Sequence, residues 1–350
     1  MTNMQCTLLV PHLLLPDDAA KEACRGLTLA ALPTLLARAR RQSFAPLGVE
    51  AWLCQAFEVE KQQDWPVAPL TLALDGGDPG AAYWLRADPV HLRLRREQLL
   101  LAGGDTLHLS QQEADQLVAA LNRHFAADGL QFVAPCAIRW YLRPASAPAI
   151  TTCALSEVTG TDVNSRLPAG EDALRWHQIW NEIQMLLHDH PLNAAREARG
   201  AMPVNSVWLW GGGSRPAVAG RHFSAVWSNE TLACALAARA DRPAAPLPDD
   251  AGHWFAAIDP SQAENARPLL VLDALSGAAQ YGDLQKWREE IAALERNWFA
   301  PLLAALRRRH LARVTLVTPG IRSCERFELT PADLLKIWRR ARALSAYCAA

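Results

Sequence analysis

Short apolar runs alternate with stretches of helical periodicity along much of the chain, and this alternation predicts a mixed α/β protein. Residues 6–10 form an apolar run of strand length near the start of the chain. In the last hundred residues such runs alternate with helical spacing, so that strands are expected at 254–258, 268–273 and 314–318, and helices at 283–310 and from Thr330 onward. This order is typical of strands joined by helices on a mostly parallel sheet flanked by helices.

The middle of the chain has a different pattern, with many short alternating runs and few helices. Ser110 and Glu113 form a capping box, which marks the start of an amphipathic helix. Residues 64–83 are rich in Pro, Gly and Asp and are expected to be irregular. Further strands are expected at 83–85, 90–94, 99–101, 106–109, 130–133 and 138–142, with a helix at 171–188. We therefore expect an α/β core domain from residues 1–80 and 190–350, interrupted by a smaller α+β insertion domain at 81–189.

The most distinctive segment is an expected strand that ends in three glycines. Residues 204–210 are mostly apolar and end at Trp210, which Gly211, Gly212, Gly213 and then Arg215 follow. Glycines let backbone N–H groups approach a ligand without a Cβ in the way, and ligands bind at strand ends in α/β sheets. The segment therefore indicates an anion-binding loop in which Arg215 adds charge-assisted hydrogen bonds. A tight turn beside a surface arginine explains it nearly as well.

Other polar residues belong to the same hypothesis. Asn193, Arg196 and Asn205 precede the glycines and are expected to converge near them. The guanidinium of Arg196 suits a phosphate or a carboxylate, whereas asparagines also brace loops through local hydrogen bonds. Asp283 and Lys286 are three residues apart at an expected helix start, where an aspartate also acts as an N-terminal cap.

Composition narrows the classes of partner. Half of the 350 residues are hydrophobic and the formal net charge is −1, so no global field favours nucleic acid or membrane lipid. No apolar stretch reaches the roughly 20 residues of a membrane span, and no secretory signal pattern is present. The eight cysteines form no C-x-x-C pair, which favours reduced thiols in a cytoplasmic protein.

Several ordered motifs resemble one enzyme family. They are Tyr83-Trp-Leu-Arg86-Ala-Asp88-Pro-Val, His190-Pro-Leu-Asn193-Ala-Ala-Arg196, Pro203-Val-Asn205-Ser-Val-Trp-Leu-Trp210-Gly, Gly282-Asp283-Leu-Gln-Lys286 and Val314-Thr-Leu-Val-Thr318-Pro. In order and spacing they are similar to the archaeal-type cofactor-independent phosphoglycerate mutases of the alkaline phosphatase superfamily. The resemblance implies that superfamily's α/β fold with an inserted domain, and metal-dependent phosphoryl chemistry.

The chain departs from that family at the positions that carry its chemistry. The first strand ends in Val10-Pro11-His12, where the family has a metal-binding aspartate, and Ala68 stands where a serine or threonine nucleophile is expected. Residues 275–280 replace a metal-binding Asp…His pattern, and Gly320-Ile321 replaces an Asp-His pair. Two-metal phosphoryl transfer needs several carboxylate and imidazole ligands. The departures imply a catalytically degenerate protein with no catalytic residues, no metal and no cofactor.

Chains that keep the Trp-Leu-Trp-Gly-Gly-Gly segment without the metal site resemble the RpfE-type regulatory proteins, which are proteobacterial. This narrower resemblance implies a regulatory role through a small phosphorylated or anionic ligand or a protein partner, and no activity as an enzyme. The alternative is an active phosphoglycerate mutase or phosphatase that uses Mn or Mg. Its metal ligands would be drawn from His12, Asp17, Asp18, Asp273 and Asp283.

Overall fold

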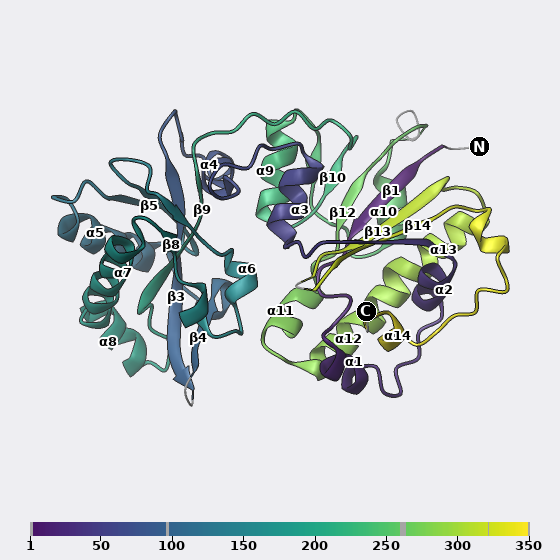
Figure 1. The fold of residues 1–350 in the computed structure, drawn as a ribbon, viewed down its shortest axis with the longest axis horizontal. Helices are drawn as coiled ribbons and strands as arrows, with labels where there is room; N and C mark the ends of the chain where they lie inside the picture. Colours follow the sequence, from purple (N-terminus) through teal and green to yellow (C-terminus); the bar gives the residue numbers. More distant parts are fainter. Residues whose placement is uncertain (1–2, 96–97, 260–263, 321, 349–350) are drawn as a thin grey trace. The chain divides into compact units, whose positions relative to one another are not determined.

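The computed structural model describes residues 3–95, 98–259, 264–320 and 322–348. The chain folds into two compact units (Figure 1). The discontinuous unit comprises Met1–Phe57 and Gly220–Ala350, and the inserted unit comprises Glu58–Ala219. Both chain ends thus belong to one unit that a second interrupts, but residues 58–80 and 190–219 belong to the inserted unit rather than to the expected core domain. None of the described helices combines the length and apolar composition that crossing a membrane requires.

The discontinuous unit is built on a seven-stranded sheet in the order β11-β10-β12-β1-β13-β14-β2. The first five strands of that order run parallel, and the last two pair antiparallel. The first strand of the chain, β1, lies in the middle, between β12 and β13. The strand bounds are β1 (Gln5–Leu9), β2 (Arg40–Phe44), β10 (Val226–Trp227), β11 (Ala244–Ala245), β12 (Leu269–Val271), β13 (Arg313–Thr318) and β14 (Cys324–Leu329).

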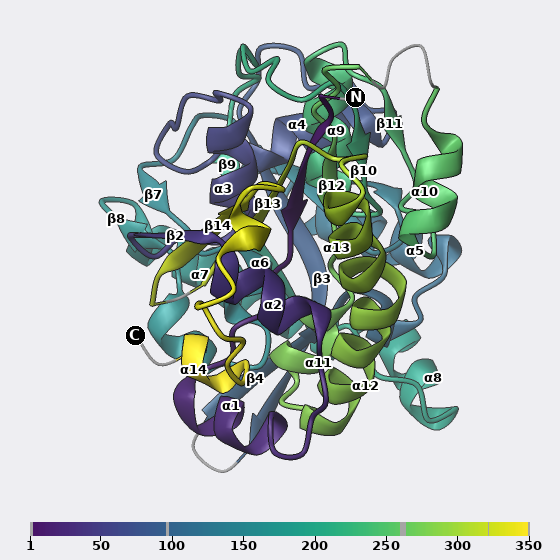
Figure 2. The same ribbon diagram turned by 90° about the vertical axis from the view of Figure 1, so that its right-hand side faces the viewer.

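Alternation along the strands divides the residues between two faces of this sheet. Cys6, Leu8, Val314 and Leu316 are buried in one large hydrophobic core under helices from both chain ends. Figures 1 and 2 place α3 and α9 on the other face. The helices are α1 (Asp17–Ala23), α2 (Ala31–Arg38), α3 (Val49–Ala56), α9 (Thr231–Arg239), α10 (Ala251–Ala257), α11 (Leu275–Gln280), α12 (Leu284–Leu294), the π-helical η3 (Glu295–Phe299), α13 (Ala300–Arg307), the 3₁₀ turn η4 (Asp333–Leu335) and α14 (Ser345–Cys348).

Two elements of the discontinuous unit differ from the sequence-based expectation. The strand expected at 254–258 falls in helix α10, because the side chain of Asp250 accepts a hydrogen bond from the N–H of His253 and caps a helix there. The helix expected from Thr330 onward is reduced to η4. There the carboxylate of Asp333 accepts hydrogen bonds from the N–H and hydroxyl of Thr330 and closes a tight turn.

The inserted unit contains an antiparallel sheet in the order β4-β3-β6-β5, with β9 also paired to β3. Its core lies between this sheet and α5 and α7. The elements are α4 (Val67–Leu74), β3 (Trp84–Arg95), β4 (Gln98–Gly103), η1 (Gly104–Leu107), α5 (Gln111–His124), β5 (Gln131–Cys136), β6 (Arg139–Arg143), β7 (Ile150–Thr151), α6 (Leu155–Val158), η2 (Val163–Arg166), β8 (Ala169–Gly170), α7 (Ala173–His188), α8 (Pro191–Ala198) and β9 (Ser206–Gly213).

The local patterns of the inserted unit were predicted with mixed success. The capping box is confirmed, because the Ser110 side chain accepts from the N–H of Glu113, whose carboxylate accepts from the N–H of Ser110. The stretch expected to be irregular contains helix α4, which tolerates Pro69 in its first turn and is buried over most of its length. The strand expected at 106–109 falls partly in the 3₁₀ turn η1.

The strand that ends in three glycines was assigned to the wrong sheet. All eight residues of β9 are buried, and it pairs antiparallel with β3 rather than joining the parallel sheet. Its apolar composition reflects burial on both faces, which sequence alone does not distinguish from a parallel core strand. Gly211–Gly213 therefore do not lie at the carboxyl edge of a parallel sheet, where the ligand-binding argument placed them.

Candidate functional site

The three glycines of β9 are required by close packing. Gly211 has a φ of +64°, which favours glycine. A Cβ on Gly212 would lie 2.2 Å from the hydroxyl of Tyr83, and one on Gly213 would lie 2.5 Å from the Cβ of Pro66. The segment is thus in contact with the residues that precede α4 and with Tyr83.

The backbone N–H groups of this glycine segment already donate hydrogen bonds to other residues of the inserted unit. The N–H of Gly211 donates to the hydroxyl of Thr152 at 3.2 Å, and the N–H of Gly212 donates to the carboxylate of Asp64. The N–H of Ser214 donates to the side-chain carbonyl of Gln62 at 3.0 Å. An external anion that used these N–H groups would have to displace Asp64. The predicted anion site therefore holds an anion supplied by the chain itself.

Asp64 accepts hydrogen bonds from both Gly212 and Thr152, and it was not among the sequence-based candidates. It is 7% exposed, and both its oxygens accept from the N–H of Thr152 at 3.1 Å. Burial raises the pKa of Asp64 in spite of these hydrogen bonds. Burial and the Asp64 charge also raise the pKa of Tyr83, whose buried hydroxyl has no hydrogen-bond partner among the described residues.

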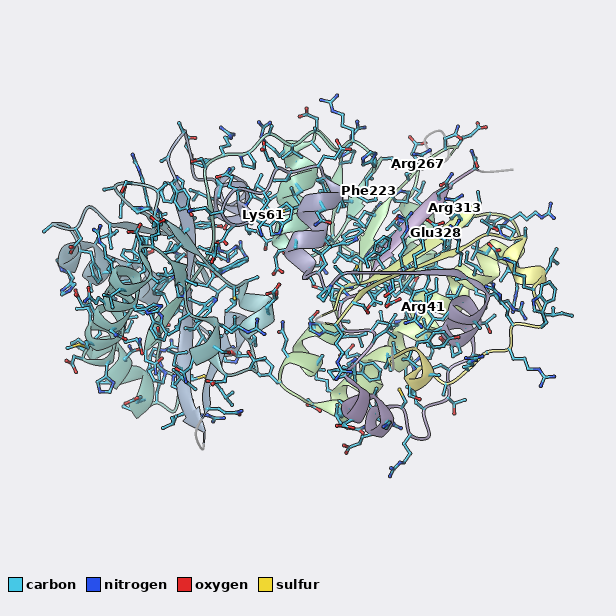
Figure 3. All side chains as sticks on the ribbon, in the orientation of Figure 1. Arg41, Lys61, Phe223, Arg267, Arg313 and Glu328 are labelled. Atoms are coloured by element: carbon cyan, nitrogen blue, oxygen red, sulfur yellow. The ribbon has the colours of Figure 1, made fainter. Side chains whose placement is uncertain are left out.

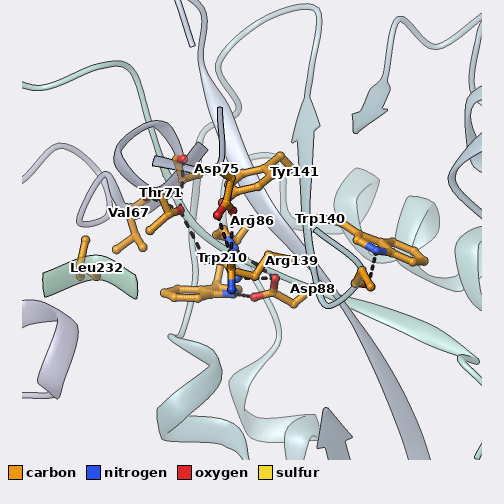
Figure 4. A network of polar contacts seen from close by, with 12 residues as sticks. Val67, Thr71, Asp75, Arg86, Asp88, Arg139, Trp140, Tyr141, Trp210 and Leu232 are labelled. Carbon is orange, nitrogen blue, oxygen red and sulfur yellow. Dashed lines mark hydrogen bonds and ion pairs between the residues drawn. The ribbon is translucent and has the colours of Figure 1, made fainter. Parts of the chain in front are cut away.

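A second group of polar side chains surrounds the indole of Trp210 (Figure 4). The indole N–H of Trp210 donates to Asp88 at 2.7 Å, and the Nη2 of Arg86 donates to the same carboxylate at 2.6 Å. The guanidinium carbon of Arg86 is 5.2 Å from the ring centroids of both Tyr141 and Trp210. Arg86 is 6% exposed and Asp88 1%, so this is a buried and paired set of charges.

Asp75 extends the network toward β6. It accepts hydrogen bonds from the Nε of Arg139 at 2.9 Å and from the hydroxyl of Tyr141 at 2.6 Å. Burial alone would raise the pKa of Asp75, but the hydrogen bonds from Arg139 and Tyr141 lower it. Arg86 also donates to the hydroxyl of Thr71 at 3.3 Å, which ties the network to α4.

The three residues expected to converge on the glycines hold the inserted unit together instead. Arg196 is 0% exposed and donates to Glu113 at 2.8 Å and to the carbonyl of Met202 at 2.9 Å. Asn193, also buried, exchanges hydrogen bonds with the backbone of Val204 at 2.9 and 2.7 Å.

Asn205 bonds to the N–H and carbonyl of Leu92 and so continues the β3–β9 ladder. The polar groups of all three residues are therefore committed to the chain itself, which is the bracing role that asparagines often have.

The remaining candidates are on the surface of their units. Arg215 is exposed, directly beyond β9 in the inserted unit. Asp283 and Lys286 are exposed in the discontinuous unit, where the Asp283 carboxylate accepts from the N–H of Lys286 at 2.9 Å and caps α12. The capping interpretation of Asp283 is confirmed, and ligand binding by Arg215 stays a prediction.

The carboxyl edge of the parallel sheet is where a metal pair would be held. His12 follows β1, Asp273 follows β12 and Gly320 follows β13. Burial lowers the pKa of His12, which favours the neutral imidazole that a metal binds, and raises the pKa of Asp273, which disfavours the carboxylate form that a metal ligand needs. Among the residues the structure describes, no group of three or more His, Cys, Asp or Glu could hold a metal ion. The side chain of Asp17 and residue Ile321 lie outside that set. The described donors do not fit a two-metal site.

A small cavity lies within the discontinuous unit at the end of β13. It has a volume of about 60 Å³, enough for a few water molecules, and is lined in part by Thr318, Gly320 and Arg41. Glu325 also lines it and accepts hydrogen bonds from Arg41 at 2.8 Å and from Ser43 at 2.7 Å. Burial opposes the shift, but these hydrogen bonds lower the pKa of Glu325. Its carboxylate therefore has internal partners already.

The structure shows where the position expected for a nucleophile lies, and which buried polar residues were not among the candidates. Ala68, at the position expected for a nucleophile, is fully buried in the first turn of α4 and carries no reactive group. The buried polar residues that were not among the sequence-based candidates are Asp64, Thr152 and the Arg86–Asp88 pair. Arg86 and Asp88 were part of a recognised motif, whereas nothing local marks Asp64, whose partners are 88 or more residues away along the chain.

Comparison with curated sequences identifies phosphoglycerate mutases as relatives of part of the chain. No family model matches. The probable 2,3-bisphosphoglycerate-independent phosphoglycerate mutase of Geobacter sulfurreducens is 29% identical over 157 residues, which are 44% of this chain and 39% of that protein. The 2,3-bisphosphoglycerate-independent phosphoglycerate mutase of Methanosarcina mazei is 27% identical over 148 residues, 41% of this chain and 37% of that protein. The match spans about two-fifths of the length of these relatives.

Comparison with solved structures extends over the whole chain. The cofactor-independent phosphoglycerate mutase from Thermoplasma acidophilum superimposes with a TM-score of 0.52 at 14% identity, covering 100% of this chain and 95% of that one. A protein from Pyrococcus horikoshii gives a TM-score of 0.53 at 12% identity, covering 94% and 88%. Such low identities show the fold and leave the function to the site. About two-fifths of the chain is thus distantly homologous to phosphoglycerate mutases, and the chain has the alkaline-phosphatase-like fold of its structural neighbours.

Proposed function

We propose that this protein is a catalytically degenerate relative of the phosphoglycerate mutases that acts by binding rather than by turnover. One observation carries the proposal: the described residues at the carboxyl edge of the parallel sheet do not supply the donors of a two-metal site. Phosphoryl transfer in this fold depends on such donors to neutralise charge on the transferring group. A chain without them keeps the scaffold and loses the chemistry.

Two further features support the same proposal. The position expected for the nucleophile is Ala68, buried and inert. The glycine segment, which resembles that of the mutases, has its N–H groups bonded to Thr152, Asp64 and Gln62 rather than free for substrate. The narrower resemblance to RpfE-type regulatory proteins is consistent with a role that depends on binding a small anionic molecule or a protein partner.

The test is a mutase assay on the full chain. Protein treated with a chelator and resupplied with Mn²⁺ or Mg²⁺ is mixed with 3-phosphoglycerate, and formation of 2-phosphoglycerate is followed. We expect a rate equal to that of the blank without protein. The Ala68→Ser variant, which introduces a hydroxyl, should also equal the blank, because the substitution adds no metal donor to those of the described residues. Turnover on the order of 1–10³ s⁻¹ would contradict the proposal.

The competing proposal is an active metal-dependent mutase or phosphatase. It is supported by the partial identity to mutase sequences and by the position of His12 and Asp273 after two neighbouring strands of the parallel sheet. It predicts turnover that depends on added Mn²⁺ or Mg²⁺ and that Asp273→Asn abolishes. Activity that survives Asp273→Asn would mean that the ligands lie elsewhere in the chain.

A further inference from the structure

A cleft of about 500 Å³ lies in the discontinuous unit on the face of the sheet opposite the large core. Its floor is formed by alternate residues of β1 and β13, which place Gln5, Thr7, Arg313 and Thr315 on that face. Residues of α3 and the segment before β10 form the wall. The volume is within the range of small-molecule sites. Nothing in the proposed function uses this cleft.

Arginines are arranged in a row across the amino ends of the central strands. Gln5 pairs with Arg313 in the β1–β13 register, and its N–H bonds to the carbonyl of Ala266, the residue before Arg267. Gln5 is two residues from Thr7, and Arg313 is two residues from Thr315, so the side chains of these strand residues share one face, and Arg267 lines the same cleft. Figure 3 shows Arg267 and Arg313 at this end of the sheet, near Phe223.

The cleft is lined by positively charged arginines and, among the described residues, by no acidic one. Its lining residues contain Arg267, Arg313 and Arg326 but no carboxylate. Arg326 forms an ion pair with Glu328 through Nη2, yet its buried Nε has no hydrogen-bond partner among the described residues. In the part of the chain that the structure describes, the guanidinium groups of Arg267 and Arg313 form no hydrogen bond and no ion pair. This differs from the inserted unit, where Arg86 and Arg196 are both paired with carboxylates.

Aromatic side chains complete the cleft. Trp52 on α3 and Phe223 line its wall, and Phe223 is held by packing on Phe57 with ring centroids 5.5 Å apart. Rings at a partly exposed wall provide a flat apolar surface for a planar ligand group. Guanidinium forks bind phosphate through paired charge-assisted hydrogen bonds. The two features lie in the same cleft.

We propose that this cleft binds a phosphorylated ring compound of the nucleotide class. Its phosphate groups face Arg267 and Arg313, and its ring lies against Trp52 and Phe223. The polar floor of Gln5, Thr7 and Thr315 supplies donors and acceptors for the groups between them. The inference goes beyond the proposed function, since it applies equally to a chain that turned over phosphoglycerate.

The experiment is calorimetric titration of the full chain with ADP, adenosine and inorganic pyrophosphate. We expect ADP to bind at least tenfold more tightly than either fragment, because only ADP engages both the arginines and the rings. Arg267→Gln and Arg313→Gln should each weaken ADP binding at least tenfold. Trp52→Leu should weaken ADP binding and leave pyrophosphate binding unchanged. The matched control is Arg308→Gln, which changes an exposed arginine at the end of α13. This variant should bind ADP with the affinity of the unaltered chain.

Two results would overturn the proposal. Absence of ADP binding, or equal affinity for ADP and pyrophosphate, would show that the cleft does not select this class of compound. An equal loss in Arg308→Gln would show that the attraction is a general effect of charge. Thermal unfolding of Arg267→Gln and Arg313→Gln should match that of the unaltered chain, which separates lost binding from lost folding. Because the readout is binding, the result is independent of the mutase assay.

Discussion

Arginines of the inserted unit's polar network are paired, whereas Arg267 and Arg313 of the cleft in the discontinuous unit, called the arginine cleft below, are not paired within the described part of the chain. Arg86 is buried, paired with Asp88 and held between two rings. Arg313 is partly exposed and has no side-chain partner among the described residues. A buried guanidinium must be paired if the fold is to be stable, whereas an unpaired one near the surface can serve a ligand. The difference separates arginines that maintain structure from those available for binding.

The largest expected effect comes from removing a partner in the buried network. Asp88→Ala leaves the Arg86 charge without its carboxylate and removes the acceptor of the Trp210 indole. We expect a loss of about 3–5 kcal/mol in the free energy of unfolding, measured by urea denaturation followed by tryptophan fluorescence. Asp128→Ala, at an exposed carboxylate of the same unit, should change it by less than about 0.5 kcal/mol. Equal effects would contradict the structural role of the Arg86–Asp88 pair.

An intermediate effect is expected at the glycine segment. Gly212→Ala places a Cβ against the hydroxyl of Tyr83, and we expect a destabilisation of about 1–3 kcal/mol in the same assay. Tyr83→Phe alone should be nearly neutral, because the buried hydroxyl it removes has no partner among the described residues. The double variant should recover part of the loss, since Leu85 still lies 2.7 Å from the added Cβ. A neutral Gly212→Ala would mean that the segment is open enough to admit a ligand.

The smallest expected effect concerns pH and tests the structural role of Arg196. Burial opposes the shift, but the Ser110 N–H and the guanidinium groups of Arg199 and Arg196 lower the pKa of Glu113 to about 2 from 4.5. The folded-state pKa is depressed, so this contribution to stability is present above about pH 4.5 and is lost as the pH falls toward 2.

Urea midpoints at pH 7 and pH 3 should therefore differ more for the unaltered chain than for Glu113→Gln. Glu182→Gln, at an exposed carboxylate, should keep the full difference. The same pH dependence in Glu113→Gln as in the unaltered chain would contradict the pairing with Arg196.

The elements found from sequence are those that local patterns specify. The apolar run of β1 and the capping box of α5 depend on neighbouring residues, and both are present. Helix α4 was missed because the prolines, glycines and aspartates around it suggested a loop, although its own residues are helical and buried. The sheet assignment of β9 was wrong because its partner β3 lies about 120 residues earlier in the chain.

The candidate site follows the same rule. Asn193 and Arg196 were recognised, but their hydrogen-bond partners at Val204 and Glu113 are 11 and 83 residues away, so sequence could not show that they were engaged. The arginine cleft did leave a local signal. Gln5 with Thr7, and Arg313 with Thr315, put polar residues at every second position of strands that are otherwise apolar, which marks a sheet face that helices cover only in part.

The central position of β1 has a consequence for the order of folding. Its ladder partners are Leu269–Val271 and Arg313–Thr318, so more than 300 residues must be synthesised before β1 has both neighbours. The inserted unit has all its sheet partners by residue 213. As the chain leaves the ribosome, that unit can therefore complete its sheet while the first strand is still unpaired. Truncation before Arg313 would then leave β1 without one of its ladder neighbours, whereas every strand of the inserted unit would keep its own.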